Sequence, residues 1–267
     1  MESTSTGANR TGTALSPANT RAMIAAVEDL TPPSTVDMSL SKAVRAEFIA
    51  EAESVGSIPP PASIAGAVKT GLSALAGNRP TILLDKMGER LAFERSGTRL
   101  YDALLTKYEA LVGGGDERFG ATLEDALEKS AATGHEAEGQ SPLEVLRRIR
   151  SEELEHFKML SDAIGRLGGD PTAQTPCADV AATAAMGYIQ VLTDPRTTLA
   201  QCLNVMLSAE LTDNAGWELL IQLADDTGQS DLAGEFLAAL GEEQQHLAIV
   251  RAWLEALLTK ETGTAAV

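Results

Sequence analysis

The chain has 267 residues, of which 44% are hydrophobic, so it is long enough to bury a full core. Only 4% are aromatic, a balance that favours helices over a β-sandwich. The net charge of -17 would repel nucleic acids and anionic membranes, so neither is expected as the main partner. The two cysteines form no CxxC pattern, and we see neither a signal peptide nor an apolar run of about 20 residues. We therefore expect a cytoplasmic protein.

The first part of the chain, residues 1–79, carries no motif and predicts a flexible N-terminal arm with short helices. Residues 1–40 are rich in Ser, Thr, Ala and Pro, which is typical of a mobile segment. Short helices are expected at Arg21–Leu30, at residues 41–54 and at Ser63–Leu75. Residues 80–262 are expected to form the folded domain.

This domain is expected to consist of four long helices, each of roughly 25–30 residues or about 40 Å. The first is predicted over Thr81–Leu111, and the second begins at Ser141-Pro142-Leu143-Glu144, a capping box with proline in the first turn. The third is predicted from Asp194-Pro195 to near Gly228. The fourth should begin at Ser230 and end near Lys260.

The connections between these helices differ in kind. A tight turn should make the third and fourth helices antiparallel neighbours, whereas residues 169–193 form a long crossover with a predicted helix at Val180–Leu192. The acidic, Gly-rich insertion at Val112–Gln140 is expected to hold a short helix at Leu123–Ala132. The fold class is therefore all-α, a four-helix bundle with a long crossover connection and an N-terminal helical extension.

Each long helix has an apolar stripe at helical spacing, and each stripe is interrupted by polar residues. A single glutamate interrupts the first and third helices, and a Glu-x-x-His pair interrupts the second and fourth. The residues are Glu94; Glu153 and His156; Glu210; Glu243 and His246. One accidental Glu-x-x-His would be unremarkable on acidic helices, but two of only three histidines have this spacing, at corresponding places in two helices.

Four carboxylates buried together require neutralisation, because burial penalises charge and like charges repel. Two divalent cations would balance them, and Glu and His at i and i+3 share one helical face. Ligation by oxygen with one imidazole per metal suits iron or manganese, and the lack of thiolates disfavours a structural zinc site. The sequence thus predicts a site for two metal ions.

Other residues near these positions carry weaker predictions. Tyr101 follows Glu94 by seven residues and Trp217 follows Glu210 by seven, so each aromatic should share a helical face with its glutamate. Tyr101 is a candidate redox-active residue, with core packing as the alternative. Asp213 is a candidate extra ligand or a partner that orients a histidine. His135 is expected to be exposed in the insertion.

The order Glu … ExxH … Glu … ExxH resembles the ferritin-like superfamily of di-iron carboxylate proteins, which includes rubrerythrins, bacterioferritins, ferritins and manganese catalases. The resemblance covers Met87 to about Leu257. It implies that Glu94 and Glu210 are terminal ligands, that Glu153 and Glu243 bridge the metals, and that His156 and His246 each cap one metal. It also implies a cofactor of two iron ions, with two manganese ions as the alternative.

Several functions fit this resemblance. The first is an oxidase or peroxidase whose reduced iron pair meets oxygen or hydrogen peroxide, with electrons from an external donor because the chain lacks a four-cysteine rubredoxin module. The alternatives are a manganese catalase, an iron storage protein and a non-catalytic helical scaffold. We also expect a homo-oligomer, because long bundles often pair side by side. The apolar face of Ser63–Leu75 needs a partner surface, either in a second copy or in its own bundle.

Overall fold

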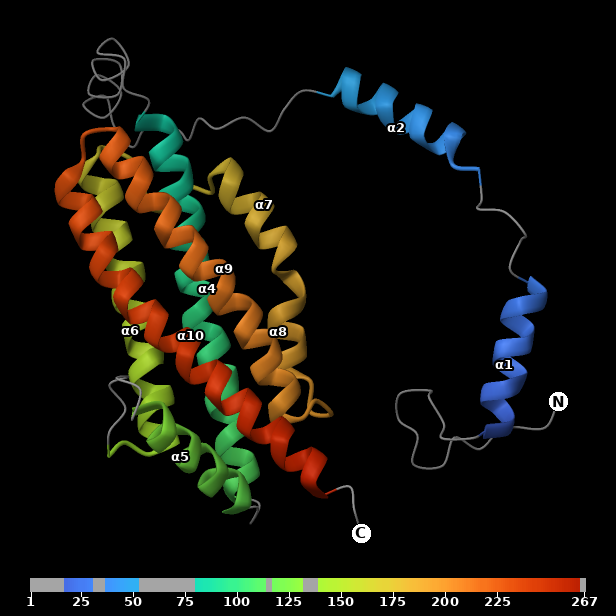
Figure 1. Cartoon of the computed structure of the whole chain (residues 1–267). Coiled ribbons are helices and arrows are strands. Elements are labelled where there is room, and N and C mark those ends of the chain that lie inside the picture. The colour runs from blue at the N-terminus through green and yellow to red at the C-terminus, as the bar shows by residue number, and fades with distance from the viewer. Residues whose placement is uncertain (1–16, 31–36, 53–79, 114–116, 132–138, 265–267) are drawn as a thin grey trace. The chain divides into compact units, whose positions relative to one another are not determined.

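The computed structural model describes residues 17–30, 37–52, 80–113, 117–131 and 139–264 (Figure 1). The chain divides into two compact units, Met1–Ser54 and Val55–Val267. The described residues of the first unit form α1 (Pro17–Leu30) and α2 (Ser39–Glu51), near two of the expected short helices. The third, Ser63–Leu75, lies outside the described residues. None of the described helices has the length and apolarity that crossing a membrane would require.

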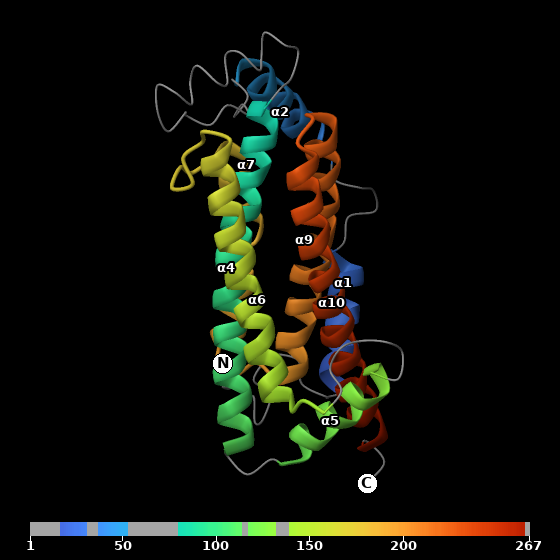
Figure 2. The ribbon, with the colours of Figure 1, turned by 90° about the vertical axis from the view of Figure 1, so that its left-hand side faces the viewer.

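The second unit is built on four long helices, which we call the core helices. They are α4 (Pro80–Gly113), α6 (Pro142–Arg166), α9 (Leu199–Asp226) and α10 (Ser230–Thr264), with 34, 25, 28 and 35 residues. Each packs on two others: α4 on α6 and α9, and α10 on α9 and α6. Figures 1 and 2 show them running side by side. The described part of the chain is thus all-α, as predicted, and contains no strand.

The interior of the core helices contains two apolar clusters with a band of polar residues between them. Every core helix contributes to both clusters, so every one passes through the polar band. The apolar periodicity of the sequence is what buries these faces. The Trp253 cluster includes Leu104, Ile149, Leu203 and Trp253, and the Phe236 cluster includes Met87, Leu160, Leu220 and Phe236.

The order of the clusters along each helix gives its direction. On α4 and α10 the chain passes from the Phe236 cluster to the Trp253 cluster, and on α6 and α9 it passes the other way. Consecutive α9 and α10 are therefore antiparallel, as predicted. Because α6 and α9 run in the same direction, their connection must return along the length of the helices.

Two short helices make that return, rather than the single crossover helix expected at Val180–Leu192. They are α7 (Pro176–Ala184) and α8 (Met186–Thr193), with Ala185 between them. Both pack on α4, and α8 also packs on α9. The Gly-rich insertion contains α5 (Glu117–Ala131), which packs on α10, and the Trp253 indole N–H donates to the carbonyl of Leu123.

Capping residues decide where the core helices begin. The predicted capping box of α6 is confirmed, because Ser141 accepts from the Glu144 N–H while the Glu144 carboxylate accepts from the Ser141 N–H. The predicted start of α9 at Asp194-Pro195 is wrong. The Asp194 carboxylate instead accepts from the Arg196 N–H in a turn, and α9 begins after Thr198, which forms its own capping box with Gln201.

The capping box of α6 predicts a measurable cost for its removal. Ser141→Ala should lower the free energy of unfolding by about 1 kcal/mol, since the Glu144 N–H loses its acceptor and the Glu144 carboxylate loses the Ser141 hydroxyl donor. Chemical denaturation measures this cost. Ser208→Ala, an exposed serine within α9 that bonds to its own helix, is the control and should change stability by less than about 0.5 kcal/mol. Equal effects of the two substitutions would contradict the capping role.

Candidate metal centre

The polar band contains the six residues singled out in the sequence. Glu94 comes from α4, Glu153 and His156 from α6, Glu210 from α9, and Glu243 and His246 from α10. All six are buried, with at most 4% of each residue exposed to solvent. The long helices thus bring one carboxylate each, and two imidazoles, to the same level of the core.

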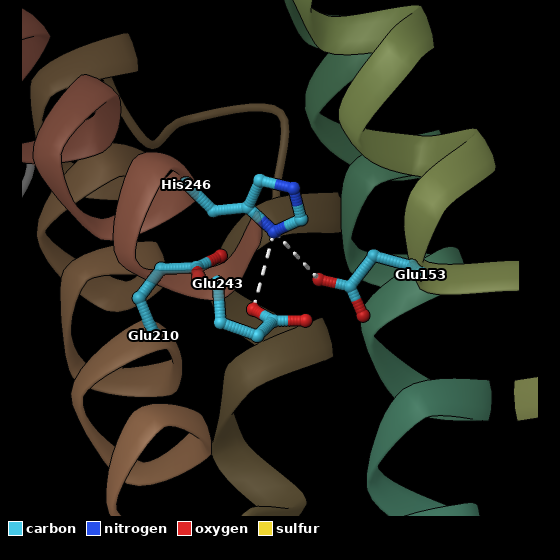
Figure 3. Close-up of side chains that lie close together, drawn as sticks. All are labelled: Glu153, Glu210, Glu243 and His246. Atoms are coloured by element: carbon cyan, nitrogen blue, oxygen red, sulfur yellow. Dashed lines mark hydrogen bonds and ion pairs between the residues drawn. The ribbon is translucent and has the colours of Figure 1, made fainter. Parts of the chain in front are cut away.

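The ligand atoms of these residues form two groups that share one carboxylate. Oxygen and nitrogen atoms of Glu94, His156 and Glu243 lie within 4.8 Å of one another, and so do those of Glu153, Glu210, Glu243 and His246. Figure 3 shows the second group, with the ring of His246 facing Glu243 and Glu153. Its Nδ1 lies 3.1 Å from Glu243 Oε2 and 3.9 Å from Glu153 Oε1. The two groups could hold one ion each, and Glu243 is a candidate ligand in both.

Each histidine is held by a glutamate from the opposite Glu-x-x-His helix. His156 Nε2 lies 2.8 Å from Glu242 Oε2, and His246 Nε2 lies 2.7 Å from Glu152 Oε2. The glutamate just before each candidate ligand thus orients the histidine across the interface between α6 and α10. This arrangement directs both Nδ1 atoms into the polar band, and a carboxylate on the outer nitrogen is a common support for a metal-binding imidazole.

Several buried atoms in the band lack a hydrogen-bond partner among the described residues. They include both carboxylate oxygens of Glu94, one each of Glu210 and Glu243, and His156 Nδ1. His156 Nδ1 is only 2.7 Å from Glu243 Oε1, but the approach lacks hydrogen-bond geometry. Buried polar atoms are nearly always hydrogen-bonded, so this concentration of donors and acceptors with at most an ion-pair contact fits the ligands of an ion.

The two aromatic residues contact the site across the helices. The Tyr101 hydroxyl donates to Glu210 Oε1 at 2.5 Å, and its ring lies 6.3 Å from that of His246. Trp217 lies edge-on to His156, with ring centroids 5.6 Å apart. Each aromatic residue thus contacts candidate ligands on other core helices, Tyr101 on α9 and α10 and Trp217 on α6.

Asp213 is buried next to the site, but it is part of neither ligand group. It forms an ion pair with the buried Arg90 of α4, whose guanidinium also lies 3.9 Å from Glu94 Oε1. A methyl group at Gly216 would overlap that guanidinium, so this glycine leaves the space for Arg90. Asp213 is expected from the sequence to be a ligand or to orient a histidine. In the structure it instead forms a salt bridge between α9 and α4.

Glu153 belongs to one ligand group rather than both, although the resemblance implies a bridging role like that of Glu243. Its carboxylate lies against α4 at Gly97, where an added Cβ would overlap Oε2 and lie 2.7 Å from Cδ. Sequence reasoning missed Gly97, although a glycine inside a long helix, three residues after Glu94, is a signal for close packing.

Other candidates lie away from the site or outside the described residues. His135 lies outside the described residues. Cys177 and Cys202 are both free. Burial and the neighbouring Asp85 carboxylate raise the pKa of the Cys177 thiol to about 12, which makes it a poor nucleophile.

Crowding of charge shifts the protonation of the site in the absence of metal. Burial, and then the Glu243 charge, raise the pKa of Glu210 to about 8, and burial raises that of Glu153 well above its ordinary range. Burial lowers the pKa of the two histidines, but the surrounding carboxylates outweigh it, raising His156 to about 11 and His246 to about 10. Without a metal, the folded site therefore holds protons in its place.

Substitution of Gly97 tests whether its missing side chain positions Glu153. Gly97→Ala should fold, because alanine favours a helix and the flexible Glu153 carboxylate can move. The displaced carboxylate should, however, lower the amount of Mn²⁺ or Fe²⁺ bound per chain. Gly234→Ala, on an open face of α10, is the matched control and should leave metal content unchanged. Equal metal content in the two variants, measured by elemental analysis, would contradict the role of Gly97.

The pKa shifts predict how the stability of the metal-free chain depends on pH. In the folded chain the pKa is about 8 for Glu210, about 10 for His246 and about 11 for His156, so each group keeps its proton up to that pH. In the unfolded chain the same groups release their protons near the ordinary pKa values of 4.5 for glutamate and 6.5 for histidine. Because the folded state then binds more protons, the free energy of unfolding should fall as pH rises from about 5 to about 9. Denaturation in the presence of a chelator measures the slope.

Glu210→Gln should make this slope shallower below about pH 8, because it removes one of the retained protons. Glu128→Gln, at an exposed position on α5, should leave the slope as it is. A stability that is constant or rises over this range would show that the buried groups do not hold these protons.

Comparison of the chain with protein-family models, with curated proteins and with solved structures gives no match. We therefore infer function from the geometry of the site. Its essential features are the six buried residues on four helices, the shared Glu243 and the cross-helix support of both histidines.

Proposed function

We propose that the core helices form a ferritin-like four-helix bundle whose centre binds two transition-metal ions, and that the protein is a di-iron oxidoreductase acting on oxygen or hydrogen peroxide. The observation that carries the proposal is the set of buried ligand atoms without hydrogen-bond partners in the described chain. Four buried glutamates and two buried histidines supply these atoms. An apolar core tolerates such a set only if something charged neutralises it.

The charge of the site matches two divalent ions. The four glutamates carry four negative charges when ionised, and two divalent ions carry four positive charges. Arg90 and Asp213 neutralise each other and leave this balance unchanged. The metals would replace the protons that the metal-free site holds, so binding would release protons and weaken at low pH.

The donor set favours iron or manganese. Carboxylate oxygens and imidazole nitrogens suit these metals, and no thiolate is among the candidate ligands. Glu94, His156 and Glu243 would hold one ion, and Glu153, Glu210, His246 and Glu243 the other. When bound, an iron pair supplies the electrons that reduce oxygen or peroxide.

The chain itself would orient the ligands and keep the site dry. Glu152 and Glu242 fix the histidine rings from outside, so that each Nδ1 faces the ions. Tyr101 donates a hydrogen bond from its hydroxyl to Glu210 and thereby fixes that carboxylate from within. In the metal-free chain, burial and this carboxylate keep the pKa of Tyr101 well above its ordinary value of 10. The two apolar clusters exclude water from both ends.

A manganese catalase is the second candidate, because the same six residues suit two manganese ions. It would disproportionate hydrogen peroxide without an external reductant, whereas the iron oxidase or peroxidase would need an electron donor. Manganese content together with oxygen release from peroxide would favour the catalase.

Metal binding is the decisive test of the proposal. Anaerobic loading should give about two iron or manganese ions per chain, and exposure of the iron form to oxygen or peroxide should oxidise it. His156→Ala and Glu94→Ala should each lower metal content and oxidation rate, while His135→Ala, at the third histidine of the chain, should change neither. In the metal-free form Glu94→Ala should keep or raise stability, since it relieves like-charge repulsion.

The outcomes separate a metal site from a structural one. If the chain binds neither iron nor manganese, or if His156→Ala and Glu94→Ala destabilise the metal-free protein and leave metal content unchanged, the residues serve only the fold. Two bound ions without oxidation by oxygen or peroxide would leave the metal site standing and overturn the proposed reaction.

A further inference from the structure

A pocket of about 310 Å³ lies between α4 and the return helices α7 and α8. Its walls are mostly apolar, with Phe93 and Leu100 on one side and Tyr188 and Ile189 on the other. Small side chains of α7, such as Ala181 and Ala182, leave the space open. The volume is at the small end of the range of ligand pockets, which is roughly 300–1,000 Å³.

The edge of this pocket is positively charged although the chain as a whole is strongly acidic. Arg95 and Arg99 line it from successive turns of α4, and both are exposed. Neither forms an ion pair with any residue in the described ranges. The one acidic residue of the lining, Glu89, is paired with Lys86 at 2.5 Å. Two unpaired like charges at i and i+4 repel each other, so an anion between them would relieve that repulsion.

We propose that this pocket binds a small organic anion with an apolar body, such as a medium-chain carboxylate. The apolar body would pack on Phe93 and Tyr188, and the carboxylate would lie between the guanidinium groups of Arg95 and Arg99. None of the six candidate metal ligands lines this pocket. Binding of such an anion therefore does not depend on the proposed metal chemistry.

The pocket also has a physical connection to the metal centre. The ring of Phe93 lies 4.5 Å from the Arg90 guanidinium carbon, and Arg90 is paired with Asp213 beside Glu94. A bound anion would therefore contact Phe93, and this ring packs against Arg90, a charged neighbour of the site.

Calorimetry on the full-length chain tests the proposal, with octanoate as the probe and with octanol and acetate as comparators. Octanoate should bind at one site per chain, octanol should bind at least about threefold more weakly, and acetate should not bind measurably. The first comparator keeps the apolar body without the charge, and the second keeps the charge without the body. The result should be the same with and without a chelator.

Variants show whether the binding site is this pocket. Arg95→Gln and Arg99→Gln should each weaken octanoate binding about threefold or more and leave octanol binding unchanged. Ala185→Leu, which fills the pocket, should weaken both ligands. Ala184→Leu, on the exposed face of α7 outside the lining, is the matched control and should weaken neither.

Three results would overturn the proposal. One is the lack of octanoate binding, and another is octanoate binding that none of the pocket variants alters. The third is a change of oligomeric mass in Ala185→Leu or in either arginine variant, because that would assign the pocket to contact with a second copy.

Discussion

The burial of four carboxylates in the middle of one helical core is the constraint on which the rest of the structure depends. Each core helix must pass from one apolar cluster through the polar band to the other, so each needs an apolar stripe interrupted at the same level. Outside that band, Trp217, Trp253 and Phe236 exclude water. Hydrophobic burial at both ends of the core thus offsets the cost of burying charge at its centre. Such a core is stable only when the buried charges are compensated.

Compensation is arranged at several levels around the candidate ligands. The outer nitrogen of each histidine contacts a glutamate of the opposite helix, and Arg90 neutralises Asp213. Asn214 donates to the backbone carbonyls of Glu210 and Glu243, which ties α9 to α10 at the same level. These contacts fix the positions of the carboxylates while leaving their inward oxygens for another partner. A preorganised site of this kind needs little rearrangement to bind an ion.

The two halves of the site are related but not equivalent. Both have a glutamate, an aromatic residue seven positions later, and a Glu-Glu-x-x-His segment on the next core helix. Gly97, three residues after Glu94, makes room for the Glu153 carboxylate, whereas Asp213, three residues after Glu210, carries a charge that requires Arg90. Tyr101 donates to Glu210, while the indole N–H of Trp217 has no hydrogen-bond partner in the described part of the chain. The two ligand groups therefore offer different environments.

The sequence by itself determined the helical class, most helix ends and the six buried polar residues, because helical periodicity and capping are local properties that a pattern of residues records. The start of α9 is also a local feature, because it follows from the capping box of Thr198 and Gln201 that the assignment of Asp194-Pro195 passed over. Tertiary structure decided the rest. The salt bridge between Arg90 and Asp213, and the crossing of Glu152 and Glu242 to opposite histidines, depend on which helices face each other. Such contacts join residues far apart in the chain, and no local pattern encodes them.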